Sequence, residues 1–132
     1  MGFLDKLTAF VSEDVYRRKL ATISTLLVTP EKERVISEIG TGIEAFTSVP
    51  AALFSFLLHP GSFENAVIYA ISLGGDTDTI GAMAGAISGA YLGVEAIPDK
   101  WLSKLENRLY IEPMAEELYQ MKLTSLEGAE VD

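Results

Sequence analysis

The sequence predicts an all-α protein. Apolar residues recur at spacings of three and four along nearly the whole chain, which is the period of one face of a helix. No run of five or more residues alternates cleanly between apolar and polar with β-branched or aromatic enrichment, so strands are not expected. Glycine and proline interrupt the apolar pattern at short intervals and divide it into separate helices.

The first three helices follow from capping and breaking residues. Ser12 is a suitable N-cap for a second helix, with Leu20 and Ile23 on its inner face. Pro30 suits the first position of a third helix because its missing N–H would be unpaired there anyway, and Gly40 ends that helix. These helices are predicted over residues 2–11, 13–28 and 30–39.

Proline and glycine also delimit the later helices. We expect Ser48 and Pro50 to open an apolar helix that is buried on all sides, and residues 59–61 to stop it. Ser62 is predicted to cap the next helix, which the glycine pair at 74–75 ends. The remaining helices are predicted over residues 51–58, 63–73, 80–94, 101–105 and 113–123. We expect one domain over residues 1–123, followed by an acidic flexible tail over residues 124–132.

The composition argues against several classes of binding partner and chemistry. Ten Lys and Arg against nineteen Asp and Glu give a formal net charge of −9, which argues against nucleic acid or an anionic membrane as the main partner. The chain contains no cysteine, so neither a disulfide framework nor a thiolate nucleophile is expected. The most apolar stretch, residues 80–94, is shorter than the roughly 20 residues that cross a bilayer. No export signal is visible near the N-terminus, and we expect a cytoplasmic protein.

Two acids follow the glycine pair, in the segment SLGGDTDTIGAMAGAISGAYLG at residues 72–93. Glycine accepts a positive φ, which lets the chain turn sharply so that Asp76, Asp78 and Thr79 converge at the start of a helix. Two carboxylates and a hydroxyl are hard oxygen donors that suit Mg²⁺, Ca²⁺ or Mn²⁺. The alternative is that these residues only cap the helix, since Asp and Thr are ordinary N-cap residues.

Glycine recurs every fourth residue in the helix that follows, at Gly81, Gly85, Gly89 and Gly93. Each glycine inside a helix costs roughly 0.8 to 1 kcal/mol relative to alanine. The close approach of another helix must therefore offset the summed cost of these glycines. We therefore predict that another helix packs tightly against this ridge.

The same segment, together with IGTGIEAFTSVPAALFSFL at residues 39–57, resembles the C-terminal half of the ADP-ribosylglycohydrolase family. The resemblance runs from Arg18 to Trp101 and is closest to the branch that acts on serine-linked ADP-ribose, poly(ADP-ribose) and O-acetyl-ADP-ribose. It implies an all-α, multi-helix orthogonal bundle that holds two Mg²⁺ ions, or Mn²⁺ in some members. The substrate would be an ADP-ribosylated protein or an ADP-ribose-containing small molecule.

The resemblance also assigns residues. It implies that Asp76, Asp78 and Thr79 are metal ligands, with Asp78 contacting both ions. It places Gly42 and Ile43 on the adenosine side of the cleft, although from the residues alone Gly42 only makes a turn. Gly75 is the third candidate substrate-binding residue. No catalytic residue is assigned.

The family's N-terminal motifs, which include its catalytic Glu and a Thr-Asp-Asp metal motif, are absent from this sequence. We therefore expect the chain to hold only part of the dinuclear site and to be inactive by itself. It would be a fragment, the product of an incomplete gene model, or one half of a split protein whose other chain supplies the missing N-terminal half. The alternative function is that of a noncatalytic truncated or crystallin-like relative with a structural or ligand-binding role.

Overall fold

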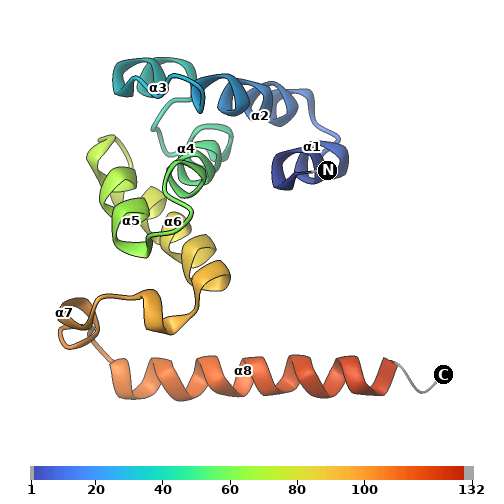
Figure 1. Cartoon of the computed structure of the whole chain (residues 1–132), viewed down its shortest axis with the longest axis vertical. Helices are drawn as coiled ribbons and strands as arrows, with labels where there is room; N and C mark the ends of the chain where they lie inside the picture. The colour runs from blue at the N-terminus through green and yellow to red at the C-terminus, as the bar shows by residue number, and fades with distance from the viewer. Residues whose placement is uncertain (1, 130–132) are drawn as a thin grey trace. The chain divides into compact units, whose positions relative to one another are not determined.

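The computed structural model describes the backbone of residues 2–129 and the side chains of residues 2–124. Within these limits every regular element is a helix, which confirms the all-α prediction (Figure 1). The elements are α1 (Phe3–Phe10), α2 (Asp14–Leu26), α3 (Lys32–Glu38), α4 (Ala45–Leu58), α5 (Phe63–Ser72), α6 (Thr77–Leu92), the short 3-10 helix η1 (Val94–Ala96), α7 (Asp99–Leu102) and α8 (Arg108–Ala129). No helix in the described part combines the length and apolar character needed to span a bilayer.

The chain divides into two compact units, Met1–Ile97 and Pro98–Asp132. The first unit holds the apolar core, in which Ile23 of α2, Phe54 of α4 and Ile80 of α6 are completely buried. Fully burying a side chain of this kind stabilises the fold by about 1.5 to 3 kcal/mol. In the second unit, none of the described side chains of residues 98–124 is buried. The prediction of a single domain over residues 1–123 stays a prediction.

Helix α4 is the centre of the first unit. Figure 1 shows α4 nearly end-on beneath α2, with α5 and α6 on its other side. Its residues 51–56 are all buried, as predicted for a helix that is apolar all round.

The start of α4 was predicted wrongly. The helix begins at Ala45, so Pro50 lies inside it and Ser48 does not cap it. The Thr47 and Ser48 hydroxyls donate to the Glu44 carbonyl, at 2.8 and 3.2 Å, and this back-bonding accompanies a turn of helix that the sequence pattern had assigned to a loop. The rule that places proline at the first helical position therefore misplaced the boundary.

The N-terminal boundaries of α2 and α3 also differ from the prediction. Glu13 rather than Ser12 occupies the N-cap position of α2, and Glu31 precedes α3, which leaves Pro30 outside the helix. Ser62 does cap α5 as predicted, because its hydroxyl accepts a hydrogen bond from the Asn65 N–H at 3.2 Å.

The second unit shows the same misplacement at a proline. Helix α8 begins at Arg108 and contains Pro113, whereas the helix was predicted to start at that proline. It also continues to Ala129, beyond the predicted end at residue 123. The last three residues of the predicted acidic tail lie outside the described residues.

The predicted packing of the glycine ridge is confirmed in part. Gly81 lies so close to α5 that a Cβ atom there would stand 2.8 Å from a methyl carbon of Ile71. Gly85 and Gly89 face Phe63 of the same helix at ordinary contact distances. Gly93 does not belong to the ridge, since it ends α6 with a φ of +86°.

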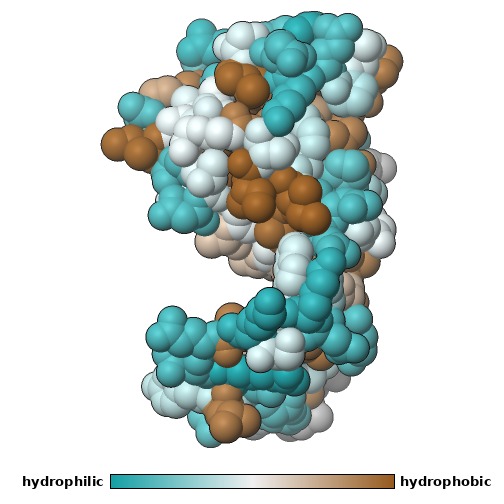
Figure 2. All heavy atoms as spheres, turned by 90° about the vertical axis from the view of Figure 1, so that its left-hand side faces the viewer, coloured by the Kyte–Doolittle hydropathy of each residue, from teal (hydrophilic) through white to brown (hydrophobic). Residues whose placement is uncertain are grey.

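The surface of the chain carries apolar patches. Figure 2 shows apolar side chains gathered among polar ones on the face that it presents. Large exposed apolar residues include Phe10, Ile43 and Leu109, each with at least 80% of its surface accessible.

Candidate metal and substrate site

The candidate site is built on the sharp corner between α5 and α6. Gly74 and Gly75 have φ values of +80° and +70°, which lie in the left-handed region that disfavours other residues. The chain therefore leaves α5 and enters α6 at Thr77 within four residues. This is the abrupt turn that the glycine pair predicted.

The corner packs against the loop of residues 40–44, which precedes α4. The Asp76 N–H donates to the Thr41 carbonyl oxygen at 2.8 Å. Gly75 lies against the same carbonyl, so a Cβ atom at this position would collide with it. Two segments that are more than 30 residues apart in the sequence thus meet through backbone groups.

The two acids of the corner influence each other electrostatically. A side-chain hydrogen bond with Asp76 holds the pKa of Asp78 below its ordinary value, and the backbone N–H groups of Thr79 and Asp78 lower that pKa further. The Thr79 N–H donates to the Asp78 carboxylate at 3.0 Å. Asp78 therefore stays ionised at neutral pH, next to a second carboxyl group.

The capping alternative does not account for Asp76. This residue occupies the N-cap position of α6, but its side chain accepts no capping hydrogen bond. Its φ and ψ of −81° and 64° also lie outside the extended conformation that is usual for an N-cap. Its carboxylate therefore makes no hydrogen bond to the N–H groups at the start of α6.

The other predicted site residues lie on the two sides of this corner. Thr79 is exposed in the first turn of α6. Gly42 is held by the Thr47 hydroxyl, which donates to its carbonyl oxygen at 3.2 Å. Ile43 follows with 80% of its surface exposed. The loop that carries Gly42 and Ile43 therefore adjoins Gly75 and Asp76. This proximity is needed if the predicted metal and substrate residues belong to one site.

The corner offers oxygen donors but no complete set of metal ligands. Among the described residues, no group of three or more Asp, Glu, His or Cys side chains is placed to hold a metal ion. Two carboxylates and the Thr79 hydroxyl are oxygen donors of the kind that Mg²⁺ and Mn²⁺ prefer, but octahedral Mg²⁺ takes six ligands. The residues present fit part of such a site.

Sequence reasoning missed Thr41. Its carbonyl is the contact that joins the loop to the corner, and any residue type would supply that group. Only its place between Gly40 and Gly42 marks it in the sequence, and those glycines predict a turn without indicating what the turn touches.

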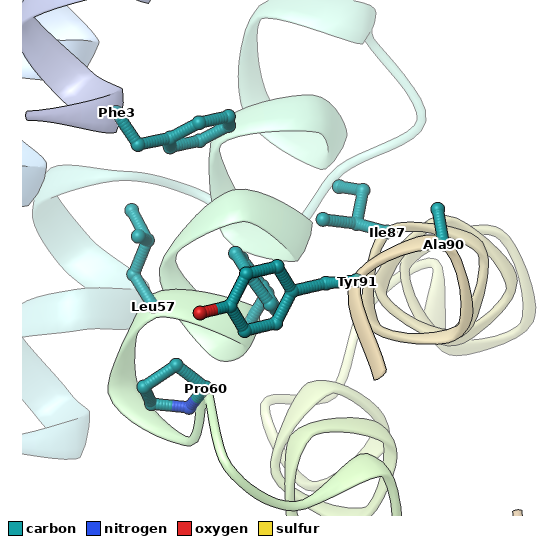
Figure 3. A pocket seen from close by; sticks show the side chains of 7 residues that line it. Phe3, Leu57, Pro60, Ile87, Ala90 and Tyr91 are labelled. Carbon is teal, nitrogen blue, oxygen red and sulfur yellow. The ribbon is translucent and has the colours of Figure 1, made fainter. Parts of the chain in front are cut away.

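An apolar groove of about 550 Å³ lies elsewhere in the first unit, toward the C-terminal end of α6. Figure 3 shows Phe3, Leu57 and Tyr91 around it, and its remaining lining residues are Phe56, Pro60, Ile87 and Ala90. Because α6 rises about 1.5 Å per residue, this groove is about 18 Å along the helix from Asp78. It offers no charged group and is separate from the acidic corner.

Comparison with known proteins identifies the family. A sequence model of the ADP-ribosylglycohydrolase family matches residues 2–127, and the chain therefore belongs to that family. Its all-α architecture is consistent with the family fold.

Curated relatives agree with this assignment. ADP-ribosylhydrolase ARH3 of Bos taurus is 39% identical over 135 residues, which cover 93% of this chain and 37% of that protein. The ARH3 protein of Homo sapiens is 39% identical over 130 residues, covering 89% of this chain and 36% of its own length. ADP-ribosylarginine hydrolase Tri1 of Serratia proteamaculans is 33% identical over 90 residues. The chain spans about a third of the length of these ARH3 relatives.

Proposed function

We propose that this chain contributes part of the active site of a metal-dependent enzyme that hydrolyses ADP-ribosyl linkages. Membership of the family and the names of the relatives support the reaction class. The observation that carries the metal assignment is the geometry of the corner, where the Asp76 carboxyl group makes no capping hydrogen bond and lies next to Asp78 at the start of α6. Two neighbouring carboxylates repel each other when both are ionised, and a divalent cation between them removes that repulsion.

In this proposal Asp76, Asp78 and Thr79 would hold part of a site for two Mg²⁺ ions, or Mn²⁺ in their place. When bound, the metal ions orient a water molecule and the ribose hydroxyls and stabilise charge as the glycosidic bond breaks. Asp78 holds its ionised carboxylate in the first turn of α6, where the helix dipole favours negative charge. No residue of this chain is assigned as the general acid or base.

The substrate is proposed to be an ADP-ribosylated protein or a small molecule that contains ADP-ribose. Gly75, which is exposed at the corner, is proposed to contact the substrate. Gly42 and Ile43, on the adjoining loop, are proposed to line the adenosine side. A direct role in binding nucleic acid is not proposed, since the net charge is −9.

The remaining metal ligands and the catalytic carboxylate are proposed to come from a further segment or a partner chain. This follows because the described residues offer too few donors to complete a dinuclear site. The 132-residue chain alone is then expected to release no ADP-ribose. The same shortage favours the second candidate, a noncatalytic relative with a structural or ligand-binding role. A cytoplasmic location stays a prediction.

Paramagnetic broadening by Mn²⁺ tests the metal assignment, because NMR detects even the weak binding expected of a partial site. We expect titration with Mn²⁺ to broaden the amide signals of residues 76–79 first. Asp78→Asn, which removes one charge and keeps the size, should abolish this selective broadening. Asp14→Asn is the matched control, since Asp14 is an exposed acid in the first turn of α2. Equal broadening in wild type and Asp78→Asn would remove Asp78 from the metal site.

A further inference from the structure

Lys19 reaches from α2 to the carbonyl end of α3. Its ammonium donates to the backbone oxygens of Glu38 at 2.8 Å and Ile39 at 2.6 Å. Carbonyls at the end of a helix have no partner within the helix and carry partial negative charge. A charged donor that bonds two of them at short distance is a strong anchor for this helix end.

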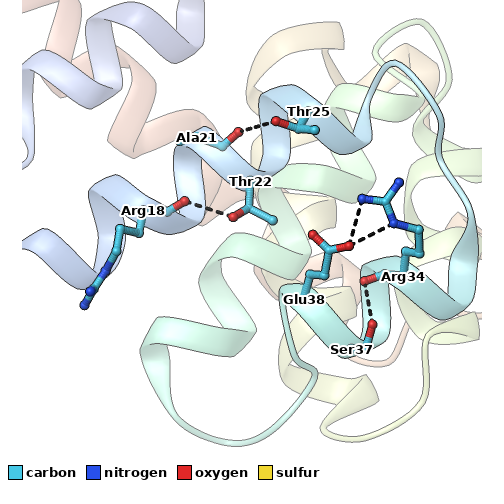
Figure 4. A network of polar contacts seen from close by, with 7 residues as sticks. All are labelled: Arg18, Ala21, Thr22, Thr25, Arg34, Ser37 and Glu38. Atoms are coloured by element: carbon cyan, nitrogen blue, oxygen red, sulfur yellow. Dashed lines mark hydrogen bonds and ion pairs between the residues drawn. The ribbon is translucent and has the colours of Figure 1, made fainter.

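The Glu38 side chain does not compete for Lys19. Figure 4 shows that its carboxylate is held by Arg34, which is four residues earlier on the same helix. Both distances from the Arg34 guanidinium to that carboxylate are 2.8 Å. The Lys19 ammonium therefore bonds to main-chain oxygens, and these bonds fix the path of the backbone.

That path leads directly to the acidic corner. Ile39 is completely buried, and Gly40 then turns the chain with a φ of +88°. The next residue is Thr41, whose carbonyl accepts the Asp76 N–H. Only Gly40 thus separates Ile39, which accepts the Lys19 bond, from Thr41, which accepts the hydrogen bond that holds the start of α6.

The loop itself has little else to hold it. Between Gly40 and the start of α4 it contains Thr41, Gly42, Ile43 and Glu44, and none of these side chains is buried. At the far end it is held by the Thr47 hydroxyl. Its near end is held by the Gly40 N–H, which donates to the Ile36 carbonyl at 3.1 Å, by the burial of Ile39 and by Lys19.

We propose that Lys19 is a positioning residue for the acidic corner, acting through the carbonyl end of α3 and the Thr41 carbonyl on the amide of Asp76. The proposal rests on the proposed metal role of Asp76 and Asp78. Lys19 itself touches neither acid in this scheme. It limits the motion of the loop against which the corner is built.

Hydrogen exchange of the Asp76 amide, measured by NMR without metal, tests this positioning. A hydrogen bond to a charged group contributes enough that its loss should speed local opening about tenfold or more. We expect Lys19→Met to raise the Asp76 exchange rate by that factor relative to the amide of Ala70, which lies in α5. The ratio of the Asp76 exchange rate to the Ala70 exchange rate distinguishes local opening of the corner from a global loss of stability.

Three further variants make the comparison specific. Arg18→Met removes the same charge from the neighbouring, exposed position, whose side chain points away from Glu38 in Figure 4, and should leave the ratio unchanged. Lys19→Arg keeps a charged donor and should stay within about threefold of wild type. Lys19→Gln, which is uncharged and shorter, replaces the Met variant if that variant does not fold. It should raise the ratio of exchange rates in the same way. An unchanged ratio in the Met or Gln variant would overturn the proposal.

Mn²⁺ broadening of residues 76–79 then links Lys19 to the metal. We expect Lys19→Met to weaken this broadening at a given Mn²⁺ concentration, whereas Arg18→Met does not. If Asp78→Asn keeps the broadening, the proposed metal site fails, and the exchange ratio still decides whether Lys19 positions the corner. If Asp78→Asn loses it but Lys19→Met keeps full broadening, the metal site stands and the positioning role is rejected.

Discussion

At the scale of single residues, the candidate site depends on a contact that only glycine permits. Gly75 combines a left-handed backbone with a position directly against the Thr41 carbonyl. A Cβ atom there would also stand 2.5 Å from the Thr41 hydroxyl oxygen. Neither constraint alone would identify a functional corner, but together they bring the loop and the acids into one place.

Three glycine-to-alanine variants separate these constraints. Gly61 has open space around it and no left-handed φ, so Gly61→Ala should change the free energy of unfolding by less than about 0.5 kcal/mol. Gly74 has open space but a φ of +80°, and Gly74→Ala should cost about 1 to 2 kcal/mol. Gly75→Ala adds the collision with Thr41 and should cost more than Gly74→Ala.

Urea denaturation of the three variants measures these differences from the transition midpoints. The order Gly61, Gly74, Gly75 is the expected result. Equal stability of the Gly74 and Gly75 variants would show that the contact with Thr41 is not tight.

At the scale of elements, the glycine ridge of α6 is less uniform than its spacing indicates. The packing argument predicts one close helix along the whole ridge, and α5 is that helix. However, only Gly81 is near enough to α5 to exclude a methyl group. At Gly89 the nearest atom to an added Cβ would be a Phe63 ring carbon at 3.7 Å, which is ordinary contact.

Alanine substitution along this ridge should therefore have opposite effects at its two ends. Gly89→Ala gains helix propensity and should stabilise the chain by up to about 1 kcal/mol. Gly81→Ala gains the same propensity, but it must displace a methyl of β-branched Ile71, whose χ1 is stiff. We expect Gly81→Ala to be less stable than Gly89→Ala by about 1 kcal/mol or more. Thermal unfolding followed by circular dichroism measures the pair, and a Gly81 variant as stable as the Gly89 variant contradicts the packing.

At the scale of the whole molecule, the described chain is unevenly stabilised. The apolar core is drawn from α2 to α6 of the first unit. The second unit has no buried side chain among residues 98–124. Because apolar burial supplies most of the stability of a fold, the second unit should open at lower denaturant concentration than the first.

The single tryptophan makes this difference measurable. Trp101 lies in α7 of the second unit, whereas most of the helical residues lie in the first. We expect the urea midpoint from tryptophan fluorescence to fall below the midpoint from far-UV circular dichroism. Coincident transitions would show that the two units unfold as one.

The sequence alone was sufficient for the class of fold, the order of the helices and the acidic corner. These features follow from local rules: apolar spacing for the helices, positive φ for Gly74 and Gly75, and capping for Ser62. The same local rules failed at Pro50 and Pro113, because both prolines lie inside helices and the sequence pattern placed each at a helix start.

Only the tertiary structure decided what the corner touches. The Thr41 carbonyl accepts a hydrogen bond from the Asp76 N–H, and Lys19 bonds to the carbonyls at the end of α3. Both contacts depend on backbone groups that the fold brings together from separate segments. Every residue has a backbone carbonyl, so no pattern of residue types predicts which carbonyl makes the contact. The residue types determined which chemistry the corner offers, and the packing of α2, α3 and the 40–44 loop determined where it is held.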